Sequence, residues 1–323
     1  MRLPAILLLV TAAFAADEAA LAIGEKISGH VGFYTAEGKR LGGVKVGTHP
    51  HEIALSPDGK TLYISDNGIL WMTDEGAGGN TISVIDVAAR RKLGVIDLGA
   101  NRRPHGLALD AKSGRLLSTI ENPDGLLLID AAARKVLRKF DVQGADPHMV
   151  LLGPGRDWAF VSNTGSNNVA AVHLESGAVK LIPVDARPQG GVLTRDGKLI
   201  YLTCGDGNSI AILDPAKKER VGSIATGRGP ARVELTPDEK TLVYNLGEGE
   251  AIAFADVALR KQTTVLPIGG RPLSMTLSRD GKLAYLGIQD QDKIVVVSVQ
   301  ERKIVRTFQT PKGAGPDPVI PLR

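Results

Sequence analysis

Apolar residues along the chain form short runs separated by polar turns, and this pattern returns about every 42 residues. Each copy has an apolar run, a turn carrying Pro, Asp or Gly, and a second apolar run, as in LSPDGKTLYIS (55–65) and LSRDGKLAYLG (277–287). In most copies a third apolar run begins about sixteen residues after the first leucine, and a basic turn and a fourth short run follow it. Helical periodicity is absent, so the pattern predicts four strands in each repeat.

A repeat of this length with four strands is typical of a β-propeller blade. Six complete repeats leave one fragment at each end of the chain. The C-terminal PDPVIPLR (316–323) has the pattern of a first strand, and residues 18–47 have those of a second, third and fourth strand. We therefore predict an all-β, seven-bladed β-propeller with four antiparallel strands per blade. Its last blade is closed by both termini, which removes the open sheet edges.

Two segments of the first complete repeat, LYISD (62–66) and NTISVIDVAARRKLGVIDLG (80–99), resemble the YVTN-family β-propeller repeat. Ile64, Ser65 and Asp66 stand where the family's name would read Val-Thr-Asn. The resemblance covers essentially the whole mature chain. It implies the propeller fold of exported bacterial and archaeal proteins, and it leaves the activity open, because the family includes surface proteins, binding modules and enzymes.

The N-terminus has the pattern of an export signal. Arg2 precedes a short apolar run, and Ala13-Phe14-Ala15 forms an A-x-A cleavage site. This predicts a signal peptide over residues 1–15 and a single propeller domain over 16–323. The apolar run is too short for an anchored membrane helix, so we expect no membrane span and a periplasmic or secreted protein. The single cysteine, Cys204, excludes an internal disulfide and falls within a strand pattern.

The chain carries 39 Lys and Arg residues against 35 Asp and Glu residues. The basic residues are scattered singly, with no basic block and no interleaved aromatic residues, so we expect no nucleic-acid partner. Solvated blade edges account better for the small positive charge.

A series of histidines marks the expected mouth of the central channel. Each innermost strand opens with proline, and the residues that follow this proline around the ring are His51, His105, His148, Gln189, Ala231, Leu273 and Asp317. Because the closing blade neighbours the first, Asp317 and the three histidines come from four consecutive blades. Imidazole and carboxylate groups bind transition metals. We predict His51, His105, His148 and Asp317 as ligands of a divalent metal such as Zn or Cu. The alternatives are contact with a polar ligand without a metal, and imidazoles that only bond to loop carbonyls.

Further polar and aromatic residues are expected around the same mouth. The first complete repeat has an insertion, NGILWMTDEGAGG (67–79), between its second and third strands, and long propeller loops are often functional. Four residues on these loops are predicted ligand contacts: Trp71, Glu121, Asn163 and Arg103. Arg187, Arg228 and Arg271 share the rim and are suited to an anionic ligand. The alternative is a neutral insertion, ordinary turn formers and surface charge.

Motifs for haem attachment, a nucleophile elbow, a P-loop and a zinc-protease helix are absent from the sequence. We therefore predict an exported binding module that holds a small molecule, a metal or a protein partner at its histidine-lined channel mouth. The alternative is an enzyme with its active site at the same mouth, either a hydrolase or lyase like the propeller lactonases and lyases or a metal-dependent oxidoreductase.

Overall fold

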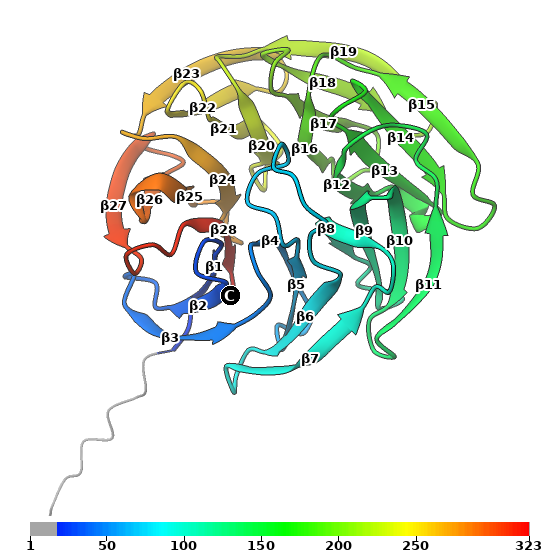
Figure 1. Cartoon of the computed structure of the whole chain (residues 1–323). Coiled ribbons are helices and arrows are strands. Elements are labelled where there is room, and N and C mark those ends of the chain that lie inside the picture. The colour runs from blue at the N-terminus through cyan, green and yellow to red at the C-terminus, as the bar shows by residue number, and fades with distance from the viewer. Residues whose placement is uncertain (1–17, 323) are drawn as a thin grey trace, which may run out of the picture.

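The computed structural model describes residues 18–322, so the predicted signal peptide lies outside the described residues. In this part of the chain, seven four-stranded antiparallel sheets are arranged as blades around a central channel (Figure 1). This confirms the predicted seven-bladed propeller. No helix that is long and apolar enough to cross a membrane occurs among residues 18–322.

In each blade, the chain passes from the innermost strand to the outermost, except that the innermost strand of blade 7 comes from the C-terminus. Blade 1 has β4 (Pro50–Leu55), β5 (Thr61–Asp66), β6 (Thr81–Asp86) and β7 (Arg91–Asp97). Blade 2 has β8 (Arg102–Leu109), β9 (Arg115–Asn122), β10 (Asp124–Asp130) and β11 (Lys135–Phe140). Blade 3 has β12 (Pro147–Leu152), β13 (Trp158–Asn163), β14 (Asn168–His173) and β15 (Val179–Pro183). Blade 4 has β16 (Pro188–Leu193), β17 (Ile200–Cys204), β18 (Ser209–Asp214) and β19 (Glu219–Ala225).

Blade 5 has β20 (Pro230–Leu235), β21 (Thr241–Leu246), β22 (Ala251–Asp256) and β23 (Lys261–Pro267). Blade 6 has β24 (Pro272–Leu277), β25 (Leu283–Ile288), β26 (Lys293–Ser298) and β27 (Lys303–Gln309). Blade 7 has β28 (Pro316–Pro321), β1 (Leu21–Glu25), β2 (His30–Tyr34) and β3 (Arg40–Lys45). Within residues 18–322, two short 3-10 helices, η1 (Pro154–Arg156) and η2 (Gln289–Gln291), lie in connections within blades 3 and 6.

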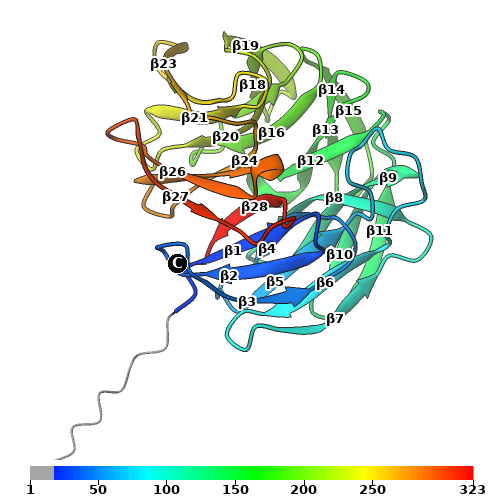
Figure 2. The ribbon, with the colours of Figure 1, turned by 60° about the vertical axis from the view of Figure 1, so that its left-hand side comes forward.

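Blade 7 is built from both ends of the described chain. The C-terminal strand β28 pairs antiparallel with β1, with Leu21 opposite Pro321 and Ile23 opposite Val319. The backbone N–H of Leu322 also donates to the carbonyl of Ala20 at 2.8 Å. Figure 2 shows the red β28 beside the blue β1. The predicted closure of the ring by the two termini is therefore confirmed.

The turn residues of the repeat explain why each inner hairpin forms. In blade 1, the Ser56 hydroxyl donates to Oδ1 of Asp58 at 2.6 Å, and the backbone N–H of Lys60 donates to the same oxygen at 3.1 Å. Gly59 has a φ of 71°, a conformation that glycine adopts at little cost. A side chain thus satisfies the turn backbone while the two apolar runs pair on either side of it.

The core lies between the blades, where the faces of neighbouring sheets pack together. Leu62, Ile64 and Ile82 are completely buried, as second and third strands of a propeller blade should be. Arginines in the turns after the third strands reach from one blade to the next: Arg90 donates to the carbonyl of Leu41 and Arg134 to that of Leu93. Part of the basic charge therefore connects neighbouring blades.

Candidate functional site

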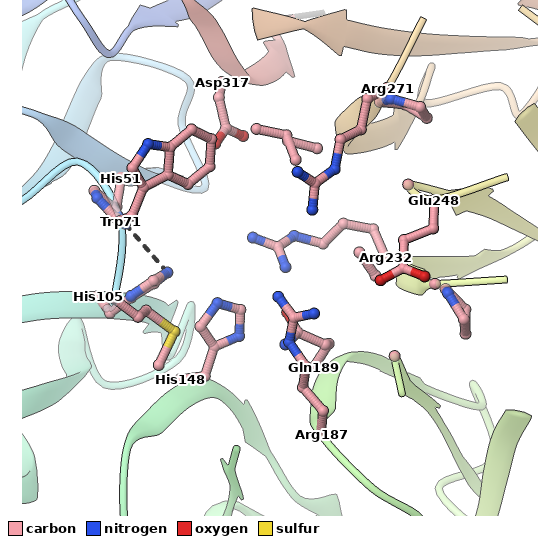
Figure 3. Close-up of a pocket in the computed structure, with 18 of the residues that line it drawn as sticks. His51, Trp71, His105, His148, Arg187, Gln189, Arg232, Glu248, Arg271 and Asp317 are labelled. Carbon is pink, nitrogen blue, oxygen red and sulfur yellow. Dashed lines mark hydrogen bonds between the residues drawn. The ribbon is translucent and has the colours of Figure 1, made fainter. Parts of the chain in front are cut away.

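A pocket of about 310 Å³ occupies one mouth of the central channel, and residues from all seven blades line it. This volume is in the range of sites for small molecules. Figure 3 shows the pocket with histidines from blades 1 to 3 on one side and arginines from blades 4 to 6 on the other. As predicted, the residues that follow the first proline of each innermost strand converge at one mouth of the channel.

A bulge at the start of the inner strands determines which side chains reach the pocket. In blade 1, Pro50 pairs with Asp66 and Ile53 with Ile64, so His51 and Glu52 together lie opposite one residue. A bulge of this kind interrupts the usual alternation of side chains between the two faces. Both His51 and Glu52 therefore line the pocket. Strict alternation would turn Glu52 away from the pocket, so the sequence pattern did not predict its position there.

The three histidines are in direct contact with one another. The ring centroids of His51 and His105 are 4.4 Å apart, and those of His105 and His148 are 4.1 Å apart. Nδ1 of His51 lies 3.3 Å from Nε2 of His105, and Nδ1 of His105 lies 2.6 Å from Oε1 of Glu121. The stack therefore continues behind the pocket wall to a carboxylate.

Hydrogen-bond chemistry fixes where the protons of this chain lie. Nε2 of His51 is 2.7 Å from the carbonyl oxygen of Ile69, which can only accept, so this nitrogen carries a proton. In a neutral His51, Nδ1 then accepts from the Nε2–H of His105. A further proton is consequently shared between Nδ1 of His105 and Glu121. Glu121 thus orients His105 from behind, as carboxylates commonly do for functional histidines.

His148 differs from the other two because its imidazole has no hydrogen-bond partner in the described part of the chain, and its Nδ1 is buried. Burial lowers the pKa of His148 well below its usual value, and nearby His105 adds to this effect. Burial, followed by the charge of Lys26, likewise lowers the pKa of His51. Both imidazoles are therefore neutral at pH 7, and His148 keeps a nitrogen available to a ligand.

Blade 7 contributes an ion pair to the same pocket. Nζ of Lys26 lies 3.3 Å from Oδ2 of Asp317, and both side chains are buried. The other carboxylate oxygen of Asp317, Oδ1, is buried without a hydrogen-bond partner. Lys26 also lies over the indole of Trp71, with Nζ 5.7 Å from the ring centroid. Asp317 therefore offers one free acceptor to the pocket.

Three guanidinium groups, from Arg187, Arg232 and Arg271, point into the opposite side of the pocket (Figure 3). Arg232 forms an ion pair with Glu52 across the channel, because β20 and β4 belong to blades on opposite sides of the ring. Both side chains are largely buried, with 15% of Arg232 and 12% of Glu52 exposed. Arg232, like Glu52, lies in a bulge at the start of an inner strand. A regular alternation of side chains between the two faces of the strand therefore does not predict that it lines the pocket.

The insertion over residues 67–79 covers one side of the mouth, and Figure 1 shows it passing over the channel. Leu70, Trp71, Met72 and Thr73 line the pocket, and Trp71 is 41% exposed. Arg103 holds this loop by donating to the carbonyls of Asp74 at 2.8 Å and Gly76 at 2.7 Å. The insertion is therefore positioned as expected, on the side of the channel where His51 lies.

The predicted ligand contacts have different positions in the structure. Trp71 lines the pocket, whereas Glu121, Asn163 and Arg103 do not. Glu121 supports His105 and Arg103 supports the insertion, while the amide of Asn163 donates to Oδ1 of Asn168 at 2.8 Å. Direct ligand contact by these three residues stays a prediction.

The predicted metal ligands, His51, His105, His148 and Asp317, all line the pocket. Among residues 18–322, however, no group of three or more His, Cys, Asp or Glu side chains is placed so that it could hold a metal ion. Both nitrogens of His51 and of His105 contact protein atoms, and Asp317 pairs with Lys26. Metal binding at these residues stays a prediction, and it would require several of these contacts to break.

No protein-family model matches the chain, and no curated protein matches it in sequence. The structure is similar to that of PpgL, the periplasmic gluconolactonase of Pseudomonas aeruginosa, with 16% identity and a TM-score of 0.76 over 94% of this chain and 98% of that one. It is similar to the dihydro-heme d1 dehydrogenase NirN in complex with DHE, with 16% identity and a TM-score of 0.70 over 98% of this chain and 78% of that one. A functionally unknown protein from Desulfotomaculum acetoxidans has 13% identity and a TM-score of 0.76 over 94% of this chain and 98% of that one. At these identities the likeness concerns the propeller fold.

Proposed function

We propose that this protein is an exported YVTN-type β-propeller that binds a small polar molecule in the pocket at its channel mouth. Two polar atoms in that pocket support the proposal: Nδ1 of His148 and Oδ1 of Asp317 are buried without a partner in the described part of the chain. Leaving such an atom unpaired costs about 1–3 kcal/mol. A bound molecule that hydrogen-bonds to both atoms recovers this free energy.

Screening by thermal shift against small polar metabolites, followed by calorimetry on the hits, tests this proposal. We expect Asp317→Asn and His148→Phe to weaken binding of any hit about tenfold or more, because each removes a partner that the ligand needs. His173→Asn is the matched control, since His173 lies on β14 outside the pocket. Binding that survives both pocket substitutions would rule out this site.

Two observations support export. The N-terminus has the pattern of a signal peptide, and the structurally similar PpgL is named as a periplasmic protein. Cell fractionation of the full-length protein, with N-terminal sequencing of the mature form, tests it. We expect a periplasmic or secreted protein that begins at residue 16. A cytoplasmic protein with an intact Met1 would contradict the export assignment alone.

An enzyme that hydrolyses a lactone is the second candidate, and the neutral, unpartnered imidazole of His148 favours it. In this reaction His148 accepts a proton from water, and the water oxygen attacks the carbonyl carbon of the lactone. The ring C–O bond then breaks, and the leaving alkoxide takes the proton back. The arginines opposite would stabilise the negative charge on the carbonyl oxygen. PpgL, named as a gluconolactonase, is a precedent for this chemistry on the same fold.

Acid release from D-glucono-1,5-lactone, followed in a pH-stat, tests the enzymatic candidate. We expect a rate above the spontaneous one, and a fall to the spontaneous rate in His148→Asn. Equal rates with and without the protein would leave only the binding proposal.

Elemental analysis of protein purified from its native compartment tests metal binding. Binding at this site requires about one equivalent of Zn or Cu per protein chain.

A further inference from the structure

We propose that the ligand of this pocket is a hydroxy acid whose carboxylate binds Arg187 and Arg271, while its hydroxyl groups face Asp317 and the histidines. This inference rests on the proposed binding function, which it extends from a small polar molecule to a chemical class. It follows from how charge and unpaired polar atoms are divided between the two walls of the pocket.

The charged residues that line the pocket carry one more positive charge than negative charge. Four are cationic and three are anionic: Lys26, Arg187, Arg232, Arg271, Glu52, Glu248 and Asp317. Lys26 pairs with Asp317 and Arg232 with Glu52, so these two cations are already neutralised. Arg271 has no ion pair or hydrogen bond among the described residues. Since His51 and His148 are neutral, the remaining excess suits a singly charged carboxylate better than a doubly charged phosphate monoester.

The positions of Arg187, Arg232 and Arg271 on one side of the pocket also favour a carboxylate ligand. In Figure 3, Arg187 and Arg271 extend toward the space in front of Arg232, from the blades on either side of it. Arg232 is paired with Glu52, but Arg271 has no ion pair among the described residues, and an anion between Arg187 and Arg271 reduces the repulsion between these two guanidinium groups. Guanidinium groups also match the planar geometry of a carboxylate. Among residues 18–322, the guanidinium of Arg187 has one partner, Asp206 at 3.2 Å, and these two side chains are 43% and 57% exposed.

The opposite wall requires neutral hydrogen-bonding groups rather than a second charge. Oδ1 of Asp317 is a buried acceptor without a partner, and a ligand hydroxyl can donate to it. Nδ1 of His148 is the second unpaired atom on this side. A carboxylate placed here would meet the negative charge of Asp317. The ligand is therefore oriented with its acid group toward blades 4 to 6 and its hydroxyls toward blades 7, 1 and 3.

Three probes separate the two parts of this inference: D-gluconate, D-glucitol, which has hydroxyls and no charge, and hexanoate, which has the charge and no hydroxyls. By calorimetry at low salt, we expect gluconate to bind at least about tenfold more tightly than either. Arg187→Gln and Arg271→Gln should each weaken gluconate about tenfold and leave glucitol unchanged. Asp317→Asn should weaken gluconate and glucitol and leave hexanoate unchanged. Arg228→Gln is the control, because Arg228 lies on the same rim outside the pocket lining.

The outcomes distinguish the ligand class from the binding function. Gluconate affinity that depends on Arg187 and Arg271 but not on Arg228 supports the inference. Glucitol that binds as tightly as gluconate, or arginine variants that bind gluconate normally, overturns it and leaves the binding proposal in place. If a neutral metabolite from the thermal-shift screen binds and none of the three probes does, the hydroxy-acid class is again wrong. If nothing binds to this pocket, both proposals fail.

Discussion

Glu234 should make the stability of this protein depend on pH in a direction opposite to that of most paired carboxylates. It lies in the inner strand β20, opposite Val243 of β21, and its carboxyl group contacts the backbone of Leu277 at the end of β24. Burial between blades 5 and 6 raises the pKa of Glu234 to about 7, and the hydrogen bond from Leu277 offsets this only in part. Substitution by Gln keeps the shape of the side chain and removes the charge.

The sign and size of the effect follow from the raised pKa. Between pH 4.5 and about 7, the folded state binds more protons at Glu234 than the unfolded state does, so the free energy of unfolding falls as pH rises through this window. One pKa unit corresponds to about 1.4 kcal/mol, which sets an upper bound of about 3 kcal/mol at pH 8. Because the side chain is only half-buried, we expect Glu234→Gln to be more stable than the wild type by about 2 kcal/mol at pH 8.

Denaturant unfolding of both proteins at pH 4.5 and pH 8 measures this difference. The neutral His51 and His148 act the other way, since their lowered pKa values remove stability as pH falls below about 6.5. That contribution is common to both proteins and cancels in the comparison. We expect the advantage of Glu234→Gln to be largest at pH 8 and nearly absent at pH 4.5. An equal difference at both pH values would refute the reasoning, and exposed Glu37→Gln serves as the control.

Four further predictions follow from the ring and its mouth. Deleting residues 316–323 should cost at least about 3 kcal/mol, because the inner strand of blade 7 and its buried side chains are lost; an unchanged melting curve would contradict this. Cys204 should react with thiol reagents far more slowly in the native protein than in denaturant, since it is buried and its pKa is raised to about 11. Breaking the Glu52–Arg232 pair by Arg232→Met should destabilise the protein by about 2–4 kcal/mol in unfolding experiments, and adding Glu52→Gln should recover part of this. Shortening the exposed part of the insertion, residues 71–77, while keeping Ile69, whose carbonyl accepts from His51, should leave the melting temperature nearly unchanged and weaken ligand binding.

The fold was predictable because the same local sequence pattern recurs in each repeat. The turn residues around Asp58 and Gly59 and the apolar runs beside them recur at a fixed period, so a single hairpin interpretation applies to every blade. Closure by β28 was predictable for the same reason. The N-terminal fragment has the patterns of a second, third and fourth strand, and the C-terminal fragment has the pattern of the first strand that it lacks.

The site was predictable only in part, because its side chains depend on contacts across the ring. The position after the proline identified His51, His105, His148 and Asp317 as neighbours, and all of them line the pocket. Glu52 and Arg232 meet although 180 positions separate them in the chain, and no local pattern indicates that pairing. Polar atoms such as those of Asn163 and Arg103 contact backbone groups of nearby loops, which composition alone does not distinguish from ligand contact.

The pairing of β28 with β1 also has a kinetic consequence. Ala20 and Leu322 are hydrogen-bonded although roughly 300 residues separate them, so closing the ring carries an entropic penalty on the order of 5 kcal/mol in the unfolded chain. Contacts of such high sequence separation form late and slow folding. A circular permutant that joins residues 322 and 18 through a short linker, and opens the chain at the exposed turn around Gly99, would make this pairing local. In such a permutant the slowest folding step would move away from blade 7, to the new pair of ends beside blade 2.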